Sequence, residues 1–385
     1  MDFRSGTEAD RLRAEVRALL EEHHGPGSAH AGVRHDWDLH RAMAARGWIA
    51  ASWPEEYGGQ GRDPFELAAL KDEIRRRGGN EGLVSTMMIA DTLRHVGNDA
   101  QKREVLPRIL AGEVLVSMGY SEPDSGSDVA AAKTRAVRDG DEWVINGQKM
   151  FTSLAEEAAY VFLLTRTNTE VPKHQGLTMF LVPFDTPGIE IHEIKTLGGE
   201  RTNVTYYNEV RVPDSARVGE VDGGWKVMTV AMTFERDVGS AWVTRVLERA
   251  IAWACSATDD TGTKVIEDPL ARERLAAIAI DNEVSRLLSL RTNWINARNE
   301  LPGVEGSMTK LFCSEAFQRA TSELLDLMGP AGVLQQGAEA AAANGWIEHD
   351  YRFSTVTTIY GGTNEIQRSI IAERHLGLPR SRPSH

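Results

Sequence analysis

The sequence has few cysteines, only Cys255 and Cys313 among 385 residues. Two thiols exclude a disulfide scaffold, a CxxC redox centre and a four-cysteine zinc site. We expect both thiols to be buried in a protein of a reducing compartment, where free cysteine behaves as a small apolar residue.

Long apolar runs are also missing. No stretch approaches the roughly 18 uncharged apolar residues that a membrane-spanning helix needs. Residues 1–16 carry charges throughout, without the apolar core of a secretory signal. The end of the chain, SRPSH, is no lipidation signal. These absences predict a cytoplasmic protein that makes no use of a membrane.

Basic residues do not dominate, since 56 Asp and Glu against 43 Lys and Arg give a net charge of −13. Nucleic acids and anionic membranes are bound through clustered Lys and Arg, so we expect neither as the main partner. The composition is otherwise that of a globular protein, with 41% apolar and 26% charged residues. Its length suggests roughly two or three domains.

The hydrophobic pattern changes twice along the chain. Residues 1–112 have helical periodicity, 113–222 contain β-branched and aromatic runs between turn signals, and 223–385 return to helical periodicity. This order predicts an α+β protein with an N-terminal helical domain, a middle antiparallel β domain and a C-terminal bundle of long helices. Rossmann folds and TIM barrels are excluded because they alternate strands and helices.

Individual elements follow from the same patterns. We expect helices over 37–46, 64–77, 82–97, 99–111, 223–257 and 268–298. We expect strands over 142–145, 160–165, 177–183, 189–194 and 205–212.

Two segments have compositions suited to binding a ligand. Residues 118–128, MGYSEPDSGSD, offer backbone N–H groups and hydroxyls to an anion or a flat polar ring, although a plain solvent loop is the alternative. Residues 360–368, YGGTNEIQR, have two glycines that let the backbone approach a ligand. A helix N-cap after a glycine turn is the alternative there.

Glu235 lies within an apolar stripe of the helix expected over 223–257. Apolar or small residues share its face one and two turns away in both directions: Met228, Ala231, Met232, Val238, Gly239 and Trp242. A carboxyl group in such surroundings has a raised pKa, as a general base working near neutrality needs. A buried ion pair with a distant arginine is the alternative.

Taken together, these segments resemble the acyl-CoA dehydrogenase family, which has the same α–β–α order. GYSEPDSGSD (119–128) resembles its flavin loop, usually TEPxxGSD, and INGQKMFTS (145–153) resembles its second flavin segment, usually NGxKxWIT. IYGGTNEIQRSIIAERHLG (359–377) resembles its C-terminal signature YEGTxxIQR. The resemblance covers nearly the whole chain. It implies the acyl-CoA dehydrogenase fold and an FAD-dependent oxidation of an acyl-CoA thioester to the trans-2-enoyl-CoA.

The resemblance also implies which residues of the middle region bind the flavin. Ser121 would contact its pyrimidine edge, and Gly126 and Ser127 would hold the pyrophosphate region. Phe151 takes the place of a tryptophan that covers the flavin face. The backbone of Ser153 would donate toward the reactive flavin nitrogen.

Further roles are implied for the third region. Thr363 and Glu365 would contact the adenosine half of FAD. Arg236 falls at a position near the CoA chain. Gly239, one helical turn after Glu235, leaves room for substrate beside that carboxylate.

Glu235 is also the catalytic base that the resemblance implies. Most family members use the Glu of YEGT, but this chain has Gly361 at that position. A minority, including isovaleryl-type enzymes, carry the base on the long helix directly before an arginine, as in Glu235-Arg236. Gly361 would still polarise the thioester carbonyl through its backbone N–H.

Two departures from the family pattern concern FAD held between subunits. The family normally has RxxFG after the long helix, and its Arg reaches a neighbour's FAD pyrophosphate, whereas residues 258–263 contain neither Arg nor Phe. Asp326 stands where the family has Gln. This pattern resembles the base-bearing subunit of the heterotetrameric (α2β2) enzymes of bacterial steroid side-chain degradation, in which the other subunit supplies the missing contacts. A homotetramer is the alternative.

The resemblance implies an acyl-CoA substrate, with a bulky steroid-type acyl group, and an electron-transfer flavoprotein as electron acceptor. Three alternatives remain open. The first is a dehydrogenase acting on a carrier-protein-bound acyl group in a tailoring pathway, and the second is a flavin oxidase or hydroxylase on the same scaffold. The third, a catalytically silent partner subunit, is disfavoured by the apolar setting of Glu235.

Overall fold

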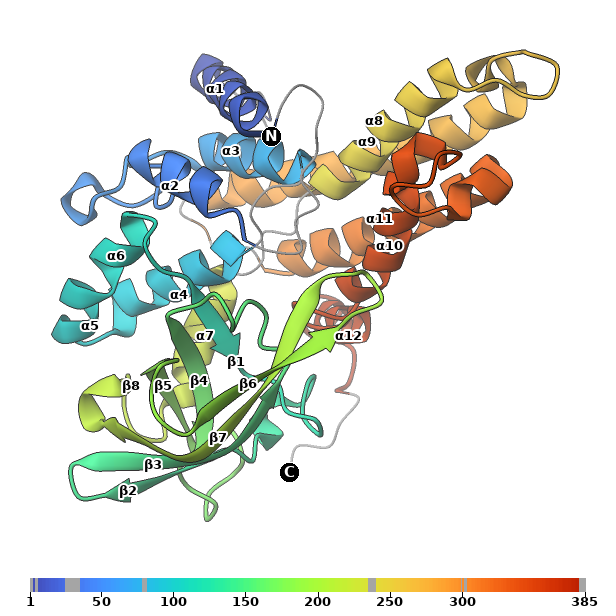
Figure 1. Cartoon of the computed structure of the whole chain (residues 1–385). Helices are drawn as coiled ribbons and strands as arrows, with labels where there is room; N and C mark the ends of the chain where they lie inside the picture. The colour runs from blue at the N-terminus through green and yellow to red at the C-terminus, as the bar shows by residue number, and fades with distance from the viewer. Residues whose placement is uncertain are drawn as a thin grey trace.

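The computed structural model has helices at both ends of the chain and a β-sheet between them (Figure 1). It describes residues 3, 6–24, 35–77, 82–234, 240–298, 300 and 303–380. The expected α–β–α order is confirmed. The expected boundaries at 112 and 222 stay predictions. None of the helices in these ranges is long and apolar enough to cross a membrane.

The N-terminal helices are α1 (Thr7–His24), α2 (Trp37–Ala45), α3 (Pro64–Arg76), α4 (Gly82–Val96), α5 (Asp99–Glu104) and α6 (Leu106–Leu110). Local signals explain their ends. The Asp63 side chain accepts the backbone N–H groups of Phe65 and Glu66, which caps α3. The single helix expected over 99–111 is wrong, because Pro107 has no N–H to donate to residue 103. The chain therefore forms two short helices there.

The central strands are β1 (Val116–Gly119), β2 (Arg135–Asp139), β3 (Glu142–Met150), β4 (Tyr160–Arg166), β5 (Leu177–Pro183), β6 (Ile189–Lys195), β7 (Arg201–Pro213) and β8 (Arg217–Val218). They form one sheet in the order β6-β7-β3-β2-β4-β5-β8, with β1 beside β4. Most strand pairs of the expected antiparallel domain are antiparallel, but β1 and β2 each pair with β4 in parallel. The long connections between these strands permit such crossovers.

Both faces of β4 and β5 are covered, which explains their continuous apolar sequences. Phe162 and Leu164 point into one hydrophobic core with the N-terminal helices and α7 (Gly224–Phe234). Leu163 and Phe180 point into a second core on the opposite face. The sheet therefore joins the N-terminal helices to the outer strands.

The C-terminal helices that follow α7 are α8 (Ala241–Ser256), α9 (Pro269–Ala297), α10 (Glu305–Met328), α11 (Trp346–Thr357) and α12 (Asn364–Arg374). The continuous helix expected over 223–257 is wrong, because Ser240 lies in a turn before α8. Val227 of α7 packs in the core of the sheet, whereas Val246 of α8 packs in the bundle core. The two helices thus serve different cores.

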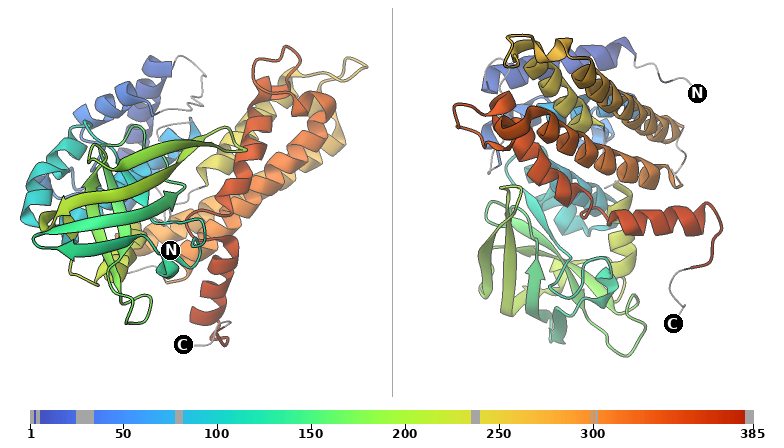
Figure 2. Two further views of the ribbon diagram at one scale, coloured as in Figure 1. Left: turned by 60° about the horizontal axis from the view of Figure 1, so that its bottom comes forward. Right: turned by 90° about the vertical axis from the view of Figure 1, so that its right-hand side faces the viewer.

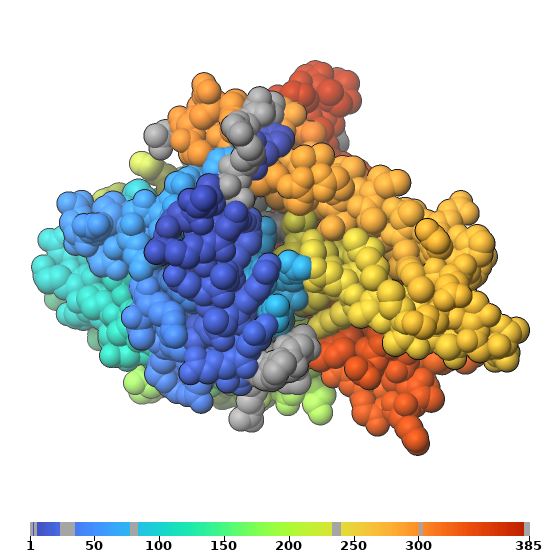
Figure 3. All heavy atoms as spheres, turned by 90° about the horizontal axis from the view of Figure 1, so that it is seen from above, coloured from blue at the N-terminus to red at the C-terminus, as the bar shows by residue number. Residues whose placement is uncertain are grey.

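Seen from above, α8 and α9 extend to one side of the N-terminal helices (Figure 3). The hairpin of β6 and β7 reaches from the sheet toward this bundle (Figure 2). At its tip the Leu197 carbonyl accepts a hydrogen bond of 2.7 Å from Arg352 of α11. The sheet and the bundle are therefore joined at the end of this hairpin.

The two cysteines lie in different environments. Cys313 on α10 is buried, and burial raises the pKa of its thiol to about 12. Cys255, in the last turn of α8, is exposed. The expectation of two buried thiols is therefore wrong for Cys255.

Candidate active site

The structure brings together the two segments that are expected to bind the flavin. The backbone N–H of Met150, at the end of β3, donates to the Ser121 carbonyl at 2.9 Å. The Ser117 hydroxyl donates to the Ser153 carbonyl at 2.8 Å. The loop after β1 and the segment after β3 therefore lie side by side.

Phe151 has an unusual conformation at this junction. Its φ is 61°, in the left-handed region, and Phe151 is 59% exposed. The buried Thr152 beside it is held by its N–H to the Asn203 carbonyl at 2.9 Å and by the Asn203 amide to its own carbonyl at 3.0 Å. Such backbone strain persists where the surrounding bonds enforce it, and it is concentrated at functional sites.

These residues fit a flavin. Phe151 offers an exposed aromatic surface, and a Cβ added at Gly126 would meet nothing within 4 Å. Ser127 is exposed on the same loop. The Ser153 N–H donates to the Phe151 carbonyl at 3.0 Å, so its expected role toward the flavin nitrogen stays a prediction.

A buried ion pair that sequence analysis missed anchors the start of this loop. Lys149, which is fully buried on β3, donates to the Glu122 carboxylate at 2.7 Å. Trp143, Ile145 and Lys149 are all buried on β3, although Gly147 between them is exposed. A lysine on the inward side of a strand requires a buried partner.

Arg166, at the end of β4, anchors the other end of the loop. It is only 8% exposed, and its guanidinium donates to the carbonyls of Ala130, Ala132 and Lys173. The Lys173 ammonium in turn pairs with Asp128 at 2.6 Å. The loop expected to bind the flavin is thus fixed at both ends.

The glycine turn before α12 is held by side-chain amides. Gly361 and Gly362 have φ of 64° and 77°, which glycine adopts without strain. The Gln367 amide donates to both of their carbonyls, at 2.9 and 3.2 Å. The buried Asn364 accepts from Lys310 of α10 at 2.7 Å. These bonds fix the backbone of Gly361 relative to α10.

Thr363 and Glu365 form the N-terminus of α12. The Thr363 side chain accepts the Ile366 N–H at 3.3 Å. The N–H of Glu365 itself and the Thr363 hydroxyl hold the pKa of the exposed Glu365 carboxyl below its ordinary value. The expected contact of both residues with adenosine stays a prediction.

Glu235, Arg236 and Gly239 lie outside the described residues. Of the residues expected on its apolar face, Met228 and Ala231 of α7 are buried, whereas Met232 is 37% exposed, so the role of Glu235 stays a prediction. Trp242 belongs to a separate helix, so its spacing from Glu235 no longer places it on the same face.

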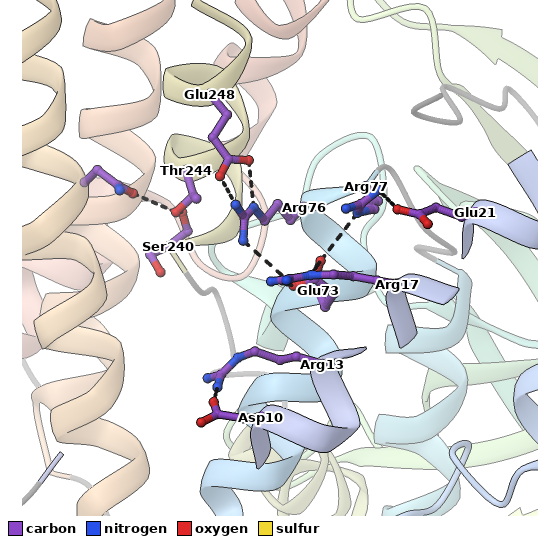
Figure 4. Close-up of polar contacts among 11 residues, drawn as sticks. Asp10, Arg13, Arg17, Glu21, Glu73, Arg76, Arg77, Ser240, Thr244 and Glu248 are labelled. Carbon is purple, nitrogen blue, oxygen red and sulfur yellow. Dashed lines mark hydrogen bonds and ion pairs between the residues drawn. The ribbon is translucent and has the colours of Figure 1, made fainter. Parts of the chain in front are cut away.

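The first turns of α8, just after this segment, are anchored to other helices (Figure 4). Arg76 of α3 donates to Glu248 at 2.7 Å. Beside it, Glu73 is buried and accepts from Arg17 of α1 at 2.7 Å. Helix α3 therefore contacts α8 directly through Glu248, and α1 contacts α3.

Profiles of known families match nearly the entire chain. An acyl-CoA dehydrogenase N-terminal domain matches residues 6–113, a middle domain matches 117–210 and a C-terminal domain matches 222–376. The chain belongs to the acyl-CoA dehydrogenase family. Members of this family are FAD-dependent flavoproteins, so the chain is an FAD-dependent oxidoreductase of the acyl-CoA dehydrogenase class.

Known acyl-CoA dehydrogenases resemble the chain over most of their lengths. FadE26 of Mycobacterium tuberculosis is 38% identical over 347 residues, covering 88% of this chain and 87% of that protein. IpdE1 of the same organism is 35% identical over 375 residues, covering 97% and 95%. These similarities support acyl-CoA dehydrogenation as the general activity.

Two solved structures share the fold of the whole chain. The ChsE4-ChsE5 complex from Mycobacterium tuberculosis has 35% identity and a TM-score of 0.90, covering 99% of this chain and 100% of that chain. The Tcur3481-Tcur3483 steroid acyl-CoA dehydrogenase has 36% identity and a TM-score of 0.89 with the same coverage.

The positions that depart from the family pattern have well-defined structures. Asp259 accepts the backbone N–H groups of Thr261 and Thr263 at 2.8 and 2.9 Å, which closes a tight turn where the family has RxxFG. Asp326 is 72% exposed at its side chain and pairs with Arg274 of α9 at 2.5 Å. This pairing, which sequence analysis missed, reduces the repulsion that Asp326 would exert on a phosphate.

Proposed function

We propose that the chain oxidises a bulky, steroid-type acyl-CoA to its trans-2-enoyl-CoA. Support for the reaction comes from the junction of Ser121 and Ser153 beside the exposed, strained Phe151, in a chain of the acyl-CoA dehydrogenase family. Support for the substrate class comes from the similar structure named a steroid acyl-CoA dehydrogenase.

In this proposal Glu235 removes the α-proton of the thioester. The Gly361 N–H donates to the thioester carbonyl and stabilises the developing enolate. The bonds from Gln367 keep that N–H in one orientation. Bound FAD would supply the hydride acceptor for the β-hydrogen. The proposed electron acceptor of the enzyme is an electron-transfer flavoprotein.

Some of the proposed binding residues contact FAD, and others contact the acyl-CoA substrate. Residues Ser121, Gly126, Ser127, Phe151, Ser153, Thr363 and Glu365 contact FAD in this proposal. Arg236 binds near the CoA chain, and Gly239 leaves space for substrate beside Glu235.

The variant Glu235→Gln tests the assignment of the base. The amide keeps the size of the side chain but cannot accept the proton, so flavin reduction should slow by about 10²–10⁴-fold. FAD and substrate should still bind, which stopped-flow spectroscopy detects as a perturbed flavin spectrum that does not bleach. The test uses CoA and carrier-protein thioesters with steroid side chains.

Glu273→Gln is the matched control, because Glu273 is exposed on α9. It should reduce flavin at the wild-type rate. If Glu235→Gln did the same while folded and loaded with FAD, Glu235 would not be the base.

We further propose a second acyl-CoA dehydrogenase-like subunit as partner, in an α2β2 assembly. Residues 258–263 form a turn without arginine, so they offer no cation to a neighbour's FAD. Similar structures are named as pairs of chains, ChsE4-ChsE5 and Tcur3481-Tcur3483.

A further inference from the structure

We propose that Glu122 and Lys149 are a positioning pair that fixes the two flavin-facing segments against each other and thereby sets the affinity for FAD. The inference rests on the proposed placement of FAD against Ser121 and residues 151–153.

Glu122 connects three parts of the chain through one carboxylate. Its Oε1 accepts from the Lys149 ammonium at 2.7 Å and from the Thr134 N–H at 2.9 Å. Its Oε2 accepts from the Lys133 N–H at 2.6 Å. The start of the flavin loop, the entrance to β2 and the end of β3 therefore meet at this side chain.

Lys149 is bonded to both sequence neighbours of Ser121. Its ammonium donates to the Tyr120 carbonyl at 3.2 Å as well as to Glu122, so it contacts the residues before and after Ser121. Ser121 itself accepts the Met150 N–H at 2.9 Å. Phe151 follows Met150 directly in the chain. The hydrogen bond between Met150 and Ser121 therefore fixes Phe151 relative to Ser121.

The burial of the pair indicates a role beyond stability. The side chains of Lys149 and Glu122 are 0% and 6% exposed. Burial lowers the pKa of Lys149 to about 8, against the opposing effect of Glu122. Burial also acts to raise the pKa of Glu122, but Lys149 and the N–H groups of Lys133 and Thr134 hold it below its ordinary value.

Apolar side chains of similar volume often stabilise a fold as well as a buried ion pair does. What they cannot supply is a set of directed bonds to fixed backbone atoms. Glu122 makes such bonds to Lys133 and Thr134, and Lys149 makes one to Tyr120. Stability alone therefore does not account for a pair with this geometry, whereas the alignment of two ligand-binding segments does.

The test compares FAD affinity with thermal stability in the purified complex. Lys149→Met removes the ammonium, and the double variant Glu122→Gln with Lys149→Met also removes the uncompensated carboxylate. After removal of FAD, the affinity for added FAD is measured by fluorescence titration. Visible circular dichroism reports the environment of the bound flavin. The single variant should bind FAD about tenfold more weakly or worse, because the site is less preorganised.

The double variant separates positioning from stability. We expect it to regain most of the melting temperature that Lys149→Met loses, without regaining FAD affinity or the wild-type dichroism. Recovery of affinity together with stability would overturn the proposal. So would wild-type affinity in Lys149→Met, which would leave the proposed function standing. A wild-type complex that binds no FAD would overturn both.

Lys133→Met is the matched control. Its ammonium pairs with the exposed Asp124 at 3.0 Å, and only its backbone N–H reaches Glu122. Lys133 and Asp124 line a hollow of about 320 Å³ on the surface of the β domain. This variant should bind FAD like the wild type.

A pH series on the wild type keeps the proposal testable if the variants do not fold. The charges that act on Lys149 are Glu122, whose pKa is lowered, and Arg166. Both stay charged between pH 7 and 9, so Lys149 is the member of this cluster whose charge changes there. FAD affinity should fall as the pH passes about 8. A flat profile would contradict the positioning role.

Discussion

Phe151 and Leu154 share a backbone conformation that few residues with side chains adopt. Their φ values are 61° and 59°, and each costs about 1–3 kcal/mol. At Leu154 the conformation has a local explanation, because its carbonyl accepts the N–H groups of Glu157 and Ala158 at 3.0 and 2.9 Å. The ring of Phe151 is mostly exposed, so protein packing contributes little to offset the strain. A planar ligand is the partner that such a ring suits.

Replacing Phe151 by Asn should therefore affect FAD more than the fold. Asn tolerates the left-handed conformation, so the free energy of unfolding should change by about 1 kcal/mol or less. FAD should bind more weakly, since the aromatic contact of about 1–3 kcal/mol is lost. Urea unfolding and FAD titration measure the two effects.

Leu154→Asn is the control for this comparison. It keeps the same backbone conformation nearby, so its FAD affinity should match that of the wild type. Equal FAD affinity in Phe151→Asn would show that the ring does not cover the flavin.

Residue periodicity reveals single positions better than pairs. Alternation along the strand expected over 142–145 places Trp143 and Ile145 on one face, but that strand stops before Lys149. The partner of Lys149 cannot be deduced from periodicity, because Glu122 lies 27 residues earlier in an irregular loop. Only the folded loop brings them together. The same limit explains why the pairing of Asp326 with Arg274 was missed.

Among the secondary-structure elements, the strands that were predicted are those with two covered faces or clear alternation. β4 and β5 are nearly continuous apolar runs. β2, with sequence RAVRD, buries only Ala136, so it has no alternation to detect. β1 spans only Val116–Gly119. β1 and β2 make the parallel pairs, so the mixed character of the sheet was missed with them. The two-residue β8 was also not predicted.

The division between α7 and α8 was beyond prediction for a related reason. No proline lies between Gly224 and Ser256 to mark a helix end, although residues 235–240 read ERDVGS. The division reflects two separate cores, one beneath the sheet and one in the bundle. Tertiary packing of this kind overrides local helix propensity.

Within the bundle, Asp350 of α11 should be indispensable for holding α8. Its side chain is 1% exposed and pairs with Arg245 at 2.7 Å and Arg249 at 2.9 Å. Asp350→Asn leaves two arginines without a counter-charge, so the free energy of unfolding should fall by about 3–5 kcal/mol. Chemical denaturation of the FAD-loaded protein measures this loss.

The pH dependence of this loss has a definite sign. Burial opposes ionisation of Asp350, but Arg245, His349 and Arg249 hold its pKa below the ordinary value. The stabilisation is therefore complete above about pH 4 and disappears as the pH falls through the lowered pKa. Asp281→Asn is the control, because its pair with Arg319 is exposed and should be worth at most about 1 kcal/mol. Equal losses in the two variants would contradict the assignment.

For the whole molecule, FAD content should depend on the partner subunit. An Arg–phosphate contact shielded from water is worth about 1.5–3 kcal/mol, or roughly 10–150-fold in affinity. Residues 258–263 provide no such contact. Expressed alone, the chain should therefore retain little FAD. Co-expressed with an acyl-CoA dehydrogenase-like chain that carries RxxFG, it should form an α2β2 assembly with bound FAD.

Size-exclusion chromatography with light scattering and flavin absorbance measures both properties in one run. Replacing the arginine of RxxFG in the co-expressed chain is the matched control, and it should lower the FAD content without dissociating the assembly. A homotetramer of this chain alone, with one tightly bound FAD per subunit, would contradict the proposal.

The unequal settings of the two thiols make the native chain ready for site-specific labelling. Thiol reagents attack the thiolate, and Cys313 is buried with a pKa raised to about 12, so it stays unreactive near neutral pH. Cys255 is exposed at the far end of α8. A maleimide dye or a nitroxide would therefore attach at that one point of the bundle without any mutation. Spin–spin distances between labels in different subunits could then map how the chains are arranged in an assembly.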